Sequence, residues 1–437
     1  MTPVRIGVLG LGTVGGGTVN VLGRNAEEIA RRAGRGVVVT RAAVRSLDRA
    51  RICATEGIGL TIDAGDIVRD PDIDVVVELI GGTDPARALV LEAIERGKHV
   101  VTANKALIAT HGNAIFEAAH ARGVMVAFEA AVAGGIPIIK ALREGLAGNR
   151  IEWLAGIING TSNFILTEMR ERGAAFADVL GEAQRLGYAE ADPTFDVEGV
   201  DAAHKLAILA AIAFGMPLDF ERVHTEGITR VTPEDVGYAG QLGYRIKHLG
   251  IARRTADGVE MRVHPTLIPE RDLLANVDGV MNAVLVKGDA VGRTLYNGPG
   301  AGDEPTASAV VADLVDVVRT LTTDPNNRVP HLAFQPDALT PVPVLSIEAA
   351  ETAFYLKMLA SDRPGVLAEI ATLFGEAGIS IEAVVQPEPP RGAAQAKLVM
   401  LTHRVRERQM NEAVARIEAL PVIEGKVTCI RMEHLDG

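Results

Sequence analysis

The chain has 437 residues, of which 48% are hydrophobic and 23% are charged, and its formal net charge is −12. At about 150 residues per domain, this length predicts a globular protein of two to four domains. The negative charge argues against general binding to nucleic acid or to an anionic membrane. The two cysteines, Cys53 and Cys429, exclude a disulfide framework and a thiolate metal cluster, and they favour a reducing cytoplasm. No apolar run reaches membrane-spanning length.

The first predicted element is a buried strand over residues 4–9, which leads into a glycine-rich turn and a helical run towards Arg32. The turn has the pattern GxGxxG between a strand and a helix, which is the context that a dinucleotide-binding turn requires. Its glycines let the backbone approach a pyrophosphate, and the helix N-terminus offers free N–H groups to the phosphates. The residues expected to bind the cofactor here are Gly10, Leu11, Gly12, Thr13, Val14 and Gly15.

The second strand is predicted over residues 37–44, and no acidic residue stands at its end to accept the ribose 2′-hydroxyl of NAD. Arg45 stands there instead and could pair with the 2′-phosphate of NADP. A solvated arginine at the end of a strand is the alternative. The sequence therefore favours NADP and leaves NAD open.

Further buried strands alternate with helical segments. The strands are predicted over residues 74–80, 99–102 and 124–128. One helix is predicted from Thr83 or Asp84 to Arg96, and another over residues 114–122. This alternation predicts an α/β fold, a Rossmann-type doubly wound parallel sheet. Ligands bind beyond the carboxyl ends of such strands, where Thr83 and Lys105 are found.

The stretch from Glu129 to Ile139 contains a Gly-Gly-Ile-Pro turn. An irregular backbone leaves carbonyl groups that need partners. Carbonyls together with one carboxylate suit a hard cation, and the alternative is a plain loop with internal hydrogen bonds.

Residues 186–214 change from a polar, acid-rich segment to an almost wholly apolar one. Apolar residues on every face predict a buried helix over residues 201–214. Asp201 and Lys205 share one face of it, and burial near a helix N-terminus favours the neutral lysine amine. The alternative is an ordinary ion pair on a solvated helix start. The acidic residues in the segment before this helix favour a functional site.

The later chain divides into further units. A glycine-rich loop that includes Gly302 opens a helix expected to return to the dinucleotide-binding domain. The C-terminal part has the order βαββαβ, which describes a ferredoxin-like unit, and it looks regulatory. The predicted organisation is a dinucleotide-binding domain over 1–130 completed by helix 303–321, an α+β substrate and dimerisation domain over 131–302, a linker over 322–350, and a regulatory domain over 351–432.

Several internal motifs together resemble homoserine dehydrogenase, in the monofunctional form with a C-terminal ACT domain. The matching segments are GLGTVGGG (10–17), VVELIGG (76–82), VVTANKA (100–106), EAAVAGGIPII (129–139), GIINGTSNFIL (156–166), LGYAEADPTFDVEGVDAAHKLAIL (186–209), GPGAGDEPTASAVVADL (298–314) and DRPGVLAEI (362–370). No aspartokinase segment precedes them. The resemblance covers nearly the whole chain.

The resemblance implies reduction of L-aspartate 4-semialdehyde to L-homoserine by NAD(P)H, and the reverse reaction, in threonine and methionine biosynthesis. By resemblance Lys205 is the acid/base and Lys105 the second catalytic lysine. The residues implied to hold substrate are Glu190, Asp201, Gly187 and Tyr188. Those implied to contact cofactor, besides the first glycine turn and Arg45, are Thr83, Lys105, Gly187 and Gly302. Those implied to bind a monovalent cation, sodium, are Glu129, Val132, Gly134 and Ile136.

The resemblance also implies a homodimer or homotetramer and amino-acid binding near residues 362–367 and 379–381, with L-threonine as the expected effector. The alternative for this unit is that it only assembles subunits. Two other functions compete with this interpretation. An acylating semialdehyde dehydrogenase needs a nucleophilic cysteine, and neither cysteine is placed for that role. An amino-acid-sensing dinucleotide-binding regulator without turnover would have no need of Lys105, Glu190, Asp201 and Lys205 together.

Overall fold

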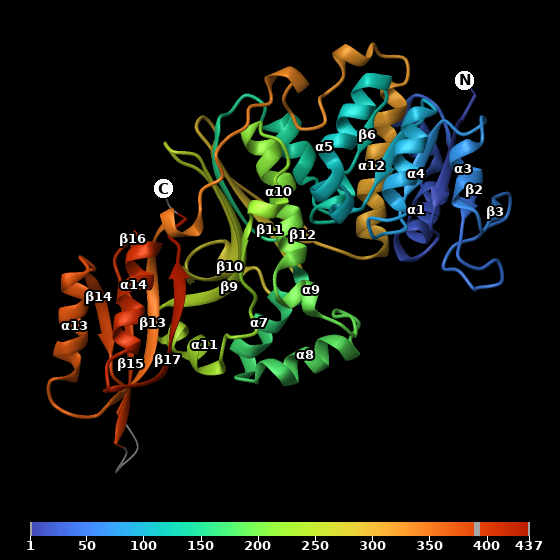
Figure 1. The fold of residues 1–437 in the computed structure, drawn as a ribbon. Coiled ribbons are helices and arrows are strands. Elements are labelled where there is room, and N and C mark those ends of the chain that lie inside the picture. Colours follow the sequence, from blue (N-terminus) through green and yellow to red (C-terminus); the bar gives the residue numbers. More distant parts are fainter. Residues whose placement is uncertain (1, 389–393, 436–437) are drawn as a thin grey trace.

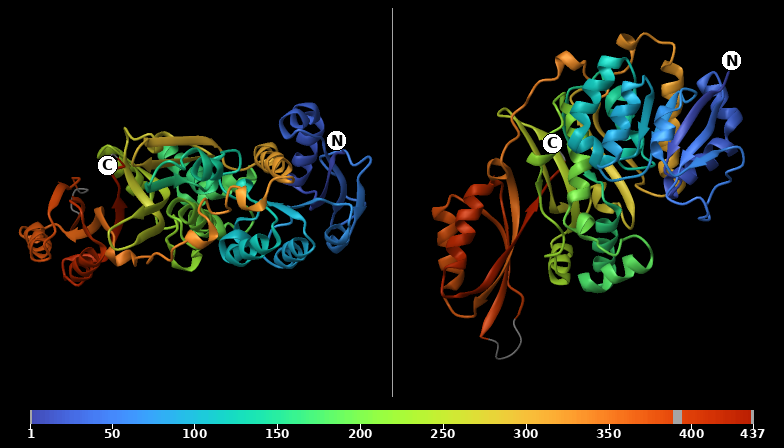
Figure 2. Two further views of the ribbon diagram at one scale, coloured as in Figure 1. Left: turned by 90° about the horizontal axis from the view of Figure 1, so that it is seen from above. Right: turned by 45° about the vertical axis from the view of Figure 1, so that its right-hand side comes forward.

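The computed structural model describes residues 2–388 and 394–435. Figure 1 shows the blue N-terminal region and the red C-terminal region at opposite ends, with the green and yellow region between them. The two further views in Figure 2 keep this order along one long axis. No helix in the described ranges is long and apolar enough to cross a membrane.

The N-terminal region is built on a six-stranded sheet of order β3-β2-β1-β4-β5-β6 in which all pairs are parallel. Its strands are β1 (Val4–Leu9), β2 (Val37–Ala43), β3 (Gly59–Thr61), β4 (Val75–Glu78), β5 (His99–Thr102) and β6 (Val126–Ala127). Its helices are α1 (Thr13–Arg24), α2 (Ala26–Ala33), α3 (Ala64–Arg69), α4 (Ala86–Glu95) and α5 (Lys105–Arg122). The predicted doubly wound parallel sheet is confirmed. The strand order reverses between β1 and β4, since β2 and β3 lie on one side of β1 and the later strands lie on the other side.

Two helices of this region differ from the prediction. The run towards Arg32 is broken at Asn25 into α1 and α2. Helix α5 begins at Lys105 rather than at residue 114, because the Asn104 side chain caps it by accepting a hydrogen bond from the Leu107 N–H at 3.1 Å. Lys105 therefore lies in the first turn of a helix and not in a loop.

Helix α12 (Asp303–Thr320) returns to the N-terminal sheet, as the sequence predicted. Its Val310 and Leu314 belong to the same hydrophobic cluster as Ile6 and Val8 of β1. Helices α1 and α12 come so close that a Cβ added to Gly17 would lie 2.7 Å from the Asp303 carbonyl oxygen. The second glycine-rich loop is thereby brought beside the first.

The remaining strands form one mixed sheet of order β12-β11-β7-β9-β10-β17-β13-β15-β14. They are β7 (Ile151–Ile157), β9 (Tyr244–Arg254), β10 (Val259–Pro269), β11 (Met281–Gly288), β12 (Gly292–Pro299), β13 (Glu351–Ser361), β14 (Ile381–Val385), β15 (Gln395–Thr402) and β17 (Ile423–Met432). Two short strands pair beside it, β8 (His224–Thr225) with β10 and β16 (Val405–Arg406) with β13. The helices of this half are α6 (Ile138–Lys140), α7 (Gly160–Arg172), α8 (Phe176–Arg185), α9 (Thr194–Val197), α10 (Val200–Phe214), α11 (Pro233–Gln241), α13 (Val366–Glu376) and α14 (Glu407–Glu418).

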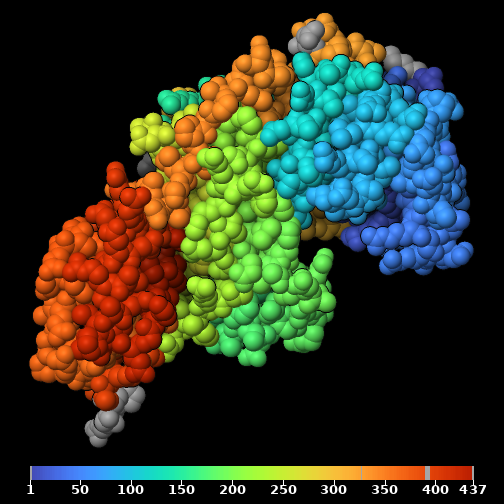
Figure 3. All heavy atoms as spheres, viewed as in Figure 1, coloured from blue at the N-terminus to red at the C-terminus, as the bar shows by residue number. Residues whose placement is uncertain are grey.

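The C-terminal elements follow the predicted βαββαβ order, with the short β16 added. Their sheet is not separate from the middle sheet, because β17 pairs in parallel with β10 through Thr266–Arg431 and Leu267–Met432. Figure 3 shows the red C-terminal part packed directly against the green part. The sequence had not predicted this continuous sheet.

A buried ion pair strengthens the junction after β17. The carboxylate of Glu433 accepts hydrogen bonds from Arg262 at 2.5 Å and from Arg253 at 3.0 Å. Arg262 lies on β10 and is 1% exposed. Burying such a guanidinium is costly unless it is paired, so Arg262 depends on Glu433 as a partner in the middle sheet.

The predicted linker over 322–350 holds short 3-10 turns and lies against the protein. Leu332 is buried in the largest hydrophobic cluster, and His331 accepts a hydrogen bond from the Val126 N–H at 3.1 Å. Val344 forms a bridge to Val259 of β10. The segment is therefore a packed connection along the surface.

Candidate active site

Helix α10 carries the central ion-pair cluster. As predicted, Asp201 and Lys205 share a face, and Lys205 Nζ donates to Asp201 Oδ2 at 2.7 Å. The same ammonium donates to the Ile158 carbonyl oxygen at 2.7 Å. From the N-terminal region, Lys105 Nζ lies 3.0 Å from Asp201 Oδ1. One buried carboxylate thus joins two lysines that come from different regions of the fold.

The cluster sets different pKa values for its two lysines. Burial lowers the pKa of Lys205, and the neighbouring Lys105 charge lowers it further, against the opposing effect of Asp201. Burial also acts on Lys105, but the charge and hydrogen bond of Asp201 outweigh it and raise the pKa of Lys105. Burial of Asp201 is outweighed by both lysines, which hold the pKa of that carboxyl well below its usual range. The two lysines of one cluster thus have pKa values shifted in opposite directions, the pKa of Lys205 downward and that of Lys105 upward.

Two further polar residues belong to this cluster and were missed by the sequence reasoning. Asn159, at the end of β7, donates from Nδ2 to Asp201 Oδ2 and to Asp196 Oδ1, both at 2.8 Å. Burial and the charge of Asp201 raise the pKa of Asp196, while the hydrogen bond from Asn159 lowers it. Asn159 lies in the segment 156–166 that resembles the family, and the acidic residues before α10 were the available signal for Asp196.

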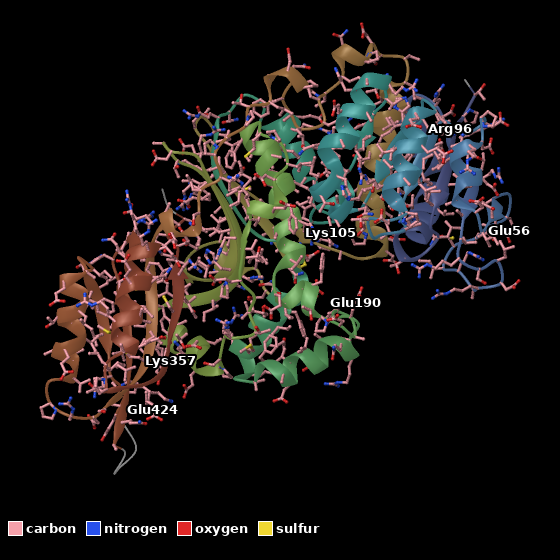
Figure 4. The ribbon with its side chains drawn as sticks, in the orientation of Figure 1. Glu56, Arg96, Lys105, Glu190, Lys357 and Glu424 are labelled. Carbon is pink, nitrogen blue, oxygen red and sulfur yellow. The ribbon has the colours of Figure 1, made fainter. Side chains whose placement is uncertain are left out.

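The loop before α9 carries the other expected substrate residues. Glu190 is exposed, and its charge helps to raise the pKa of Lys105. Tyr188 packs edge-on against Phe164, with its backbone carbonyl accepting from the Thr161 hydroxyl at 2.6 Å. Gly187 takes a left-handed φ of 76° at the end of α8. Figure 3 shows the surface hollowed between the blue region and the green region, and Figure 4, in the same orientation, places Lys105 above that hollow and Glu190 below it.

The glycine turn after β1 has the space that a pyrophosphate needs. Gly10 has a φ of 97°, and a Cβ there would lie 2.9 Å from the Leu79 carbonyl oxygen. A Cβ on Gly15 would overlap the Gly10 carbonyl oxygen. Among the described residues no atom lies within 4 Å of the place for a Gly12 Cβ, and no side chain caps the first N–H groups of α1. These residues fit a dinucleotide phosphate.

Two of the other expected cofactor residues follow the strands that flank β1, and the third begins helix α12. Thr83 comes after β4, and Arg45 comes after β2 and is exposed. Gly302, with a φ of 130°, is the N-cap of α12, which lies beside α1. These positions share the carboxyl edge of the parallel sheet with the glycine turn.

The turn after β6 contains the expected cation ligands. Glu129 is buried, and its carboxylate accepts hydrogen bonds from the N–H groups of Ile139 at 2.9 Å and Lys140 at 2.8 Å. The backbone is left-handed at Ala133, with φ 55°, and at Gly134, with φ 41°. A Cβ on Gly134 would lie 2.6 Å from the carbonyl oxygen of Gly300, so this turn lies against the loop that holds Gly302.

Three family models match the chain. The model described as "Homoserine dehydrogenase, NAD binding domain" matches residues 10–129, that described as "Homoserine dehydrogenase" matches 137–315, and that described as "ACT domain" matches 354–422. A homoserine dehydrogenase of Pseudomonas aeruginosa is 64% identical over 436 residues, which span 100% of both chains. The chain belongs to the homoserine dehydrogenase family. It is accordingly an oxidoreductase that acts on a CH–OH group and binds a nicotinamide dinucleotide through its N-terminal region.

Solved structures of the family share all or most of this architecture. The crystal structure of a homoserine dehydrogenase from Thiobacillus denitrificans has a TM-score of 0.94 and 66% identity, covering 99% of this chain and 98% of that one. A hyperthermophilic archaeal homoserine dehydrogenase solved in complex with NADPH has a TM-score of 0.63 and 25% identity, covering 74% of this chain and 100% of that one. The matches to this enzyme family confirm the fold that the sequence predicted, including the C-terminal ACT domain. The alternative of a regulator without turnover is not favoured.

Proposed function

We propose that the chain interconverts L-aspartate 4-semialdehyde and L-homoserine, in threonine and methionine biosynthesis, with Lys205 as the proton donor and acceptor. The observation that carries this proposal is the Asp201 carboxylate held between Lys205 and Lys105. Hydride addition to an aldehyde creates an alkoxide, which a positioned ammonium can protonate. The nicotinamide dinucleotide, when bound, supplies the hydride.

The two lysines have different tasks in this proposal. The lowered pKa of Lys205 lets its ammonium give up a proton to the alkoxide, and lets its amine accept that proton in the reverse direction. The raised pKa of Lys105 keeps a positive charge beside the reacting oxygen. Asp201 orients both ammonium groups.

The amino-acid end of the substrate carries an ammonium and a carboxylate. Glu190, which stands beside the hollow with Lys105, is the proposed partner of the ammonium together with Asp201. Gly187 and Tyr188 shape the loop that holds Glu190, and the positive φ of Gly187 favours glycine there.

The proposed cofactor is NADP, with NAD as the alternative. Arg45 stands exposed after β2 without an acidic residue beside it in the sequence, and a guanidinium suits a 2′-phosphate. Complex formation of the archaeal relative with NADPH is consistent with this choice. The glycine turn at 10–15, Thr83 and Gly302 would contact the phosphates and the nicotinamide half.

A monovalent cation, sodium, is proposed in the turn after β6. Carbonyl oxygens of Val132, Gly134 and Ile136 with the Glu129 carboxylate form the proposed ligand set. The cation would hold this turn against the loop of Gly302 and so support cofactor binding.

For the C-terminal domain we propose regulation by L-threonine at residues 362–367, within a cytoplasmic homodimer or homotetramer. Glycine at position 365, with φ 95°, allows backbone N–H groups to approach a carboxylate. A chain shortened to residue 344 would lose β17 and Glu433 and leave Arg262 without that partner, so a point substitution is the better test. Gly365→Val should abolish threonine inhibition and leave uninhibited turnover near normal; unchanged inhibition would contradict this site.

The function itself is tested with purified protein, L-aspartate 4-semialdehyde and either NADPH or NADH. We expect oxidation of NADPH at a higher kcat/KM than NADH, with L-homoserine as the product identified by chromatography. Binding of either cofactor without turnover would support the regulator instead.

A further inference from the structure

Asn159 occupies a position between the middle sheet and the reacting groups. It lies two residues after the end of β7, is 5% exposed, and is the N-cap of α7, where its Oδ1 accepts a hydrogen bond from the Ser162 N–H at 2.8 Å. Because Oδ1 is engaged by a donor, the amide nitrogen must point the other way, towards Asp196 and Asp201. The orientation of this side chain is therefore fixed by its cap.

The amide nitrogen of Asn159 has two hydrogens, and the structure uses both. One is donated to Asp201 Oδ2 and the other to Asp196 Oδ1, each at 2.8 Å. Two carboxylates so close together repel each other, and a shared pair of donors offsets that repulsion. The backbone of Asp196 is also held, since its carbonyl accepts from the Ser162 hydroxyl at 3.1 Å.

Asp201 is thereby fixed at both of its oxygens. Oδ2 accepts hydrogen bonds from Asn159 and Lys205, and Oδ1 forms an ion pair with Lys105. The neighbouring carbonyl of Ile158 accepts from Lys205 as well. Residues 158 and 159 thus hold the Lys205 ammonium both directly and through the carboxylate.

We propose that Asn159 is a positioning residue for hydride transfer: its amide holds the Asp196 and Asp201 carboxylates in one orientation and, through Asp201, sets the place of Lys205 Nζ. This proposal rests on the proposed role of Lys205. Without the amide, Asp201 is held by its two lysines alone and is less restricted about its side-chain bonds, and Asp196 loses a donor that favours its ionised form. A displacement of about 1 Å at a reacting group can cost about a hundredfold in rate.

Two substitutions separate positioning from capping. Asn159→Ser keeps a good N-cap residue but cannot bridge the two carboxylates. Asn159→Asp keeps the shape and a cap oxygen, yet replaces the donor by a third carboxylate. Asn163→Ser is the matched control, because Asn163 is an equally buried amide on α7 whose Nδ2 bridges the carbonyls of Val277 and Gly279 instead of carboxylates.

The measurement is kcat, KM and the pH profile of aldehyde reduction for each variant, with thermal unfolding recorded alongside. For Asn159→Ser we expect kcat to fall about 10- to 100-fold, with an unchanged KM for NADPH. The acid limb of the pH profile, which reports protonation of the Asp196 carboxylate, should move to higher pH by about one unit. The reason is that a hydrogen bond to a charged group contributes about a tenfold preference for the ionised form of that group. Asn159→Asp should lose more activity, and Asn163→Ser should lose stability but keep the acid limb in place.

The outcomes are distinguishable from failure of the proposed function. If Lys205→Met keeps wild-type turnover, the role of Lys205 is wrong. If Lys205→Met loses activity while Asn159→Ser and Asn159→Asp keep the wild-type kcat and acid limb, Asn159 is a cap alone and the positioning role is refuted. Should Asn159→Ser fail to fold, Asn159→Asp decides the question, because it preserves the cap.

Discussion

Replacing Lys205 by methionine separates the chemistry of the buried lysine from its structural contribution. The Lys205 ammonium donates to one carbonyl, at Ile158, and to one carboxylate, at Asp201. Lys247 has the same kind of surroundings on β9, since it donates to the Val277 carbonyl at 2.7 Å and to Asp278 at 3.0 Å. Lys247→Met is therefore a matched control for the loss of a buried ion pair.

The two variants should lose similar stability. Removing one partner of a buried pair costs about 3–5 kcal/mol when the other charge is left alone. Here Asp201 keeps Lys105 and Asp278 keeps Arg170, at 3.0 and 2.9 Å, so we expect roughly 1–3 kcal/mol in each case. Urea unfolding measures this loss.

The two variants should differ in catalysis. Loss of a general acid lowers kcat by about 10²- to 10⁴-fold, which corresponds to about 2.7–5.4 kcal/mol of transition-state stabilisation. Lys205→Met should show this loss while its Kd for NADPH stays near the wild-type value, and Lys247→Met should keep kcat. Equal losses of kcat in both variants, or no loss in Lys205→Met, would refute the assignment of Lys205 as proton donor.

Four further predictions concern Arg45, the pH dependence set by Lys205, Glu433 and Glu129. Arg45→Ala should weaken NADPH binding about 10- to 100-fold and leave NADH nearly unchanged in titrations; equal effects would remove Arg45 from the cofactor site. The pKa of Lys205 is lowered, so its ammonium should lose its proton at a pH below the ordinary lysine pKa of about 10.4. As pH rises through that value, the rate of aldehyde reduction should fall and the rate of homoserine oxidation should rise. Rate profiles against pH in both directions check this. Glu433→Gln should lower the free energy of unfolding, measured in urea, by roughly 3 kcal/mol. This is the low end for a broken buried pair, because Glu260 remains 3.3 Å from Arg262. A loss below about 1 kcal/mol would show that the pair is not needed for stability. Replacing sodium chloride by choline chloride should raise the KM for NADPH in the wild type but not in Glu129→Gln, and an equal response of both proteins would dismiss the cation site.

The parts of the fold that the sequence predicted are those with a strong local pattern. The glycine turn at 10–15 has a backbone requirement that few other sequences meet, and the structure shows it between β1 and α1. The helix over 201–214 was recognisable because apolar residues surround two charges, and the structure places it as α10, buried along its length. In both cases short-range sequence carried the physical cause.

The parts that were missed depend on contacts far apart in the sequence. Strand β9 contains Lys247 and His248, which look like surface residues until their partners, Asp278 and the Glu226 carbonyl, are known. The pairing of β17 with β10 joins residues near 431 to residues near 266 and has no local signal. The same holds for Asn159, whose role in the cluster depends on where Asp196 and Asp201 lie in space.

Chemical rescue of Lys205→Ala tests the central claim most directly, namely that a proton passes through the buried amine at position 205. Small primary amines are added to this variant with NADPH and L-aspartate 4-semialdehyde, and formation of L-homoserine is followed. The account predicts that amines restore part of the lost rate, in an order that follows their pKa and size, and that they do not accelerate the wild type. A Lys205→Ala enzyme that binds NADPH normally and gains no rate from any amine, or one that needs no rescue, would contradict it.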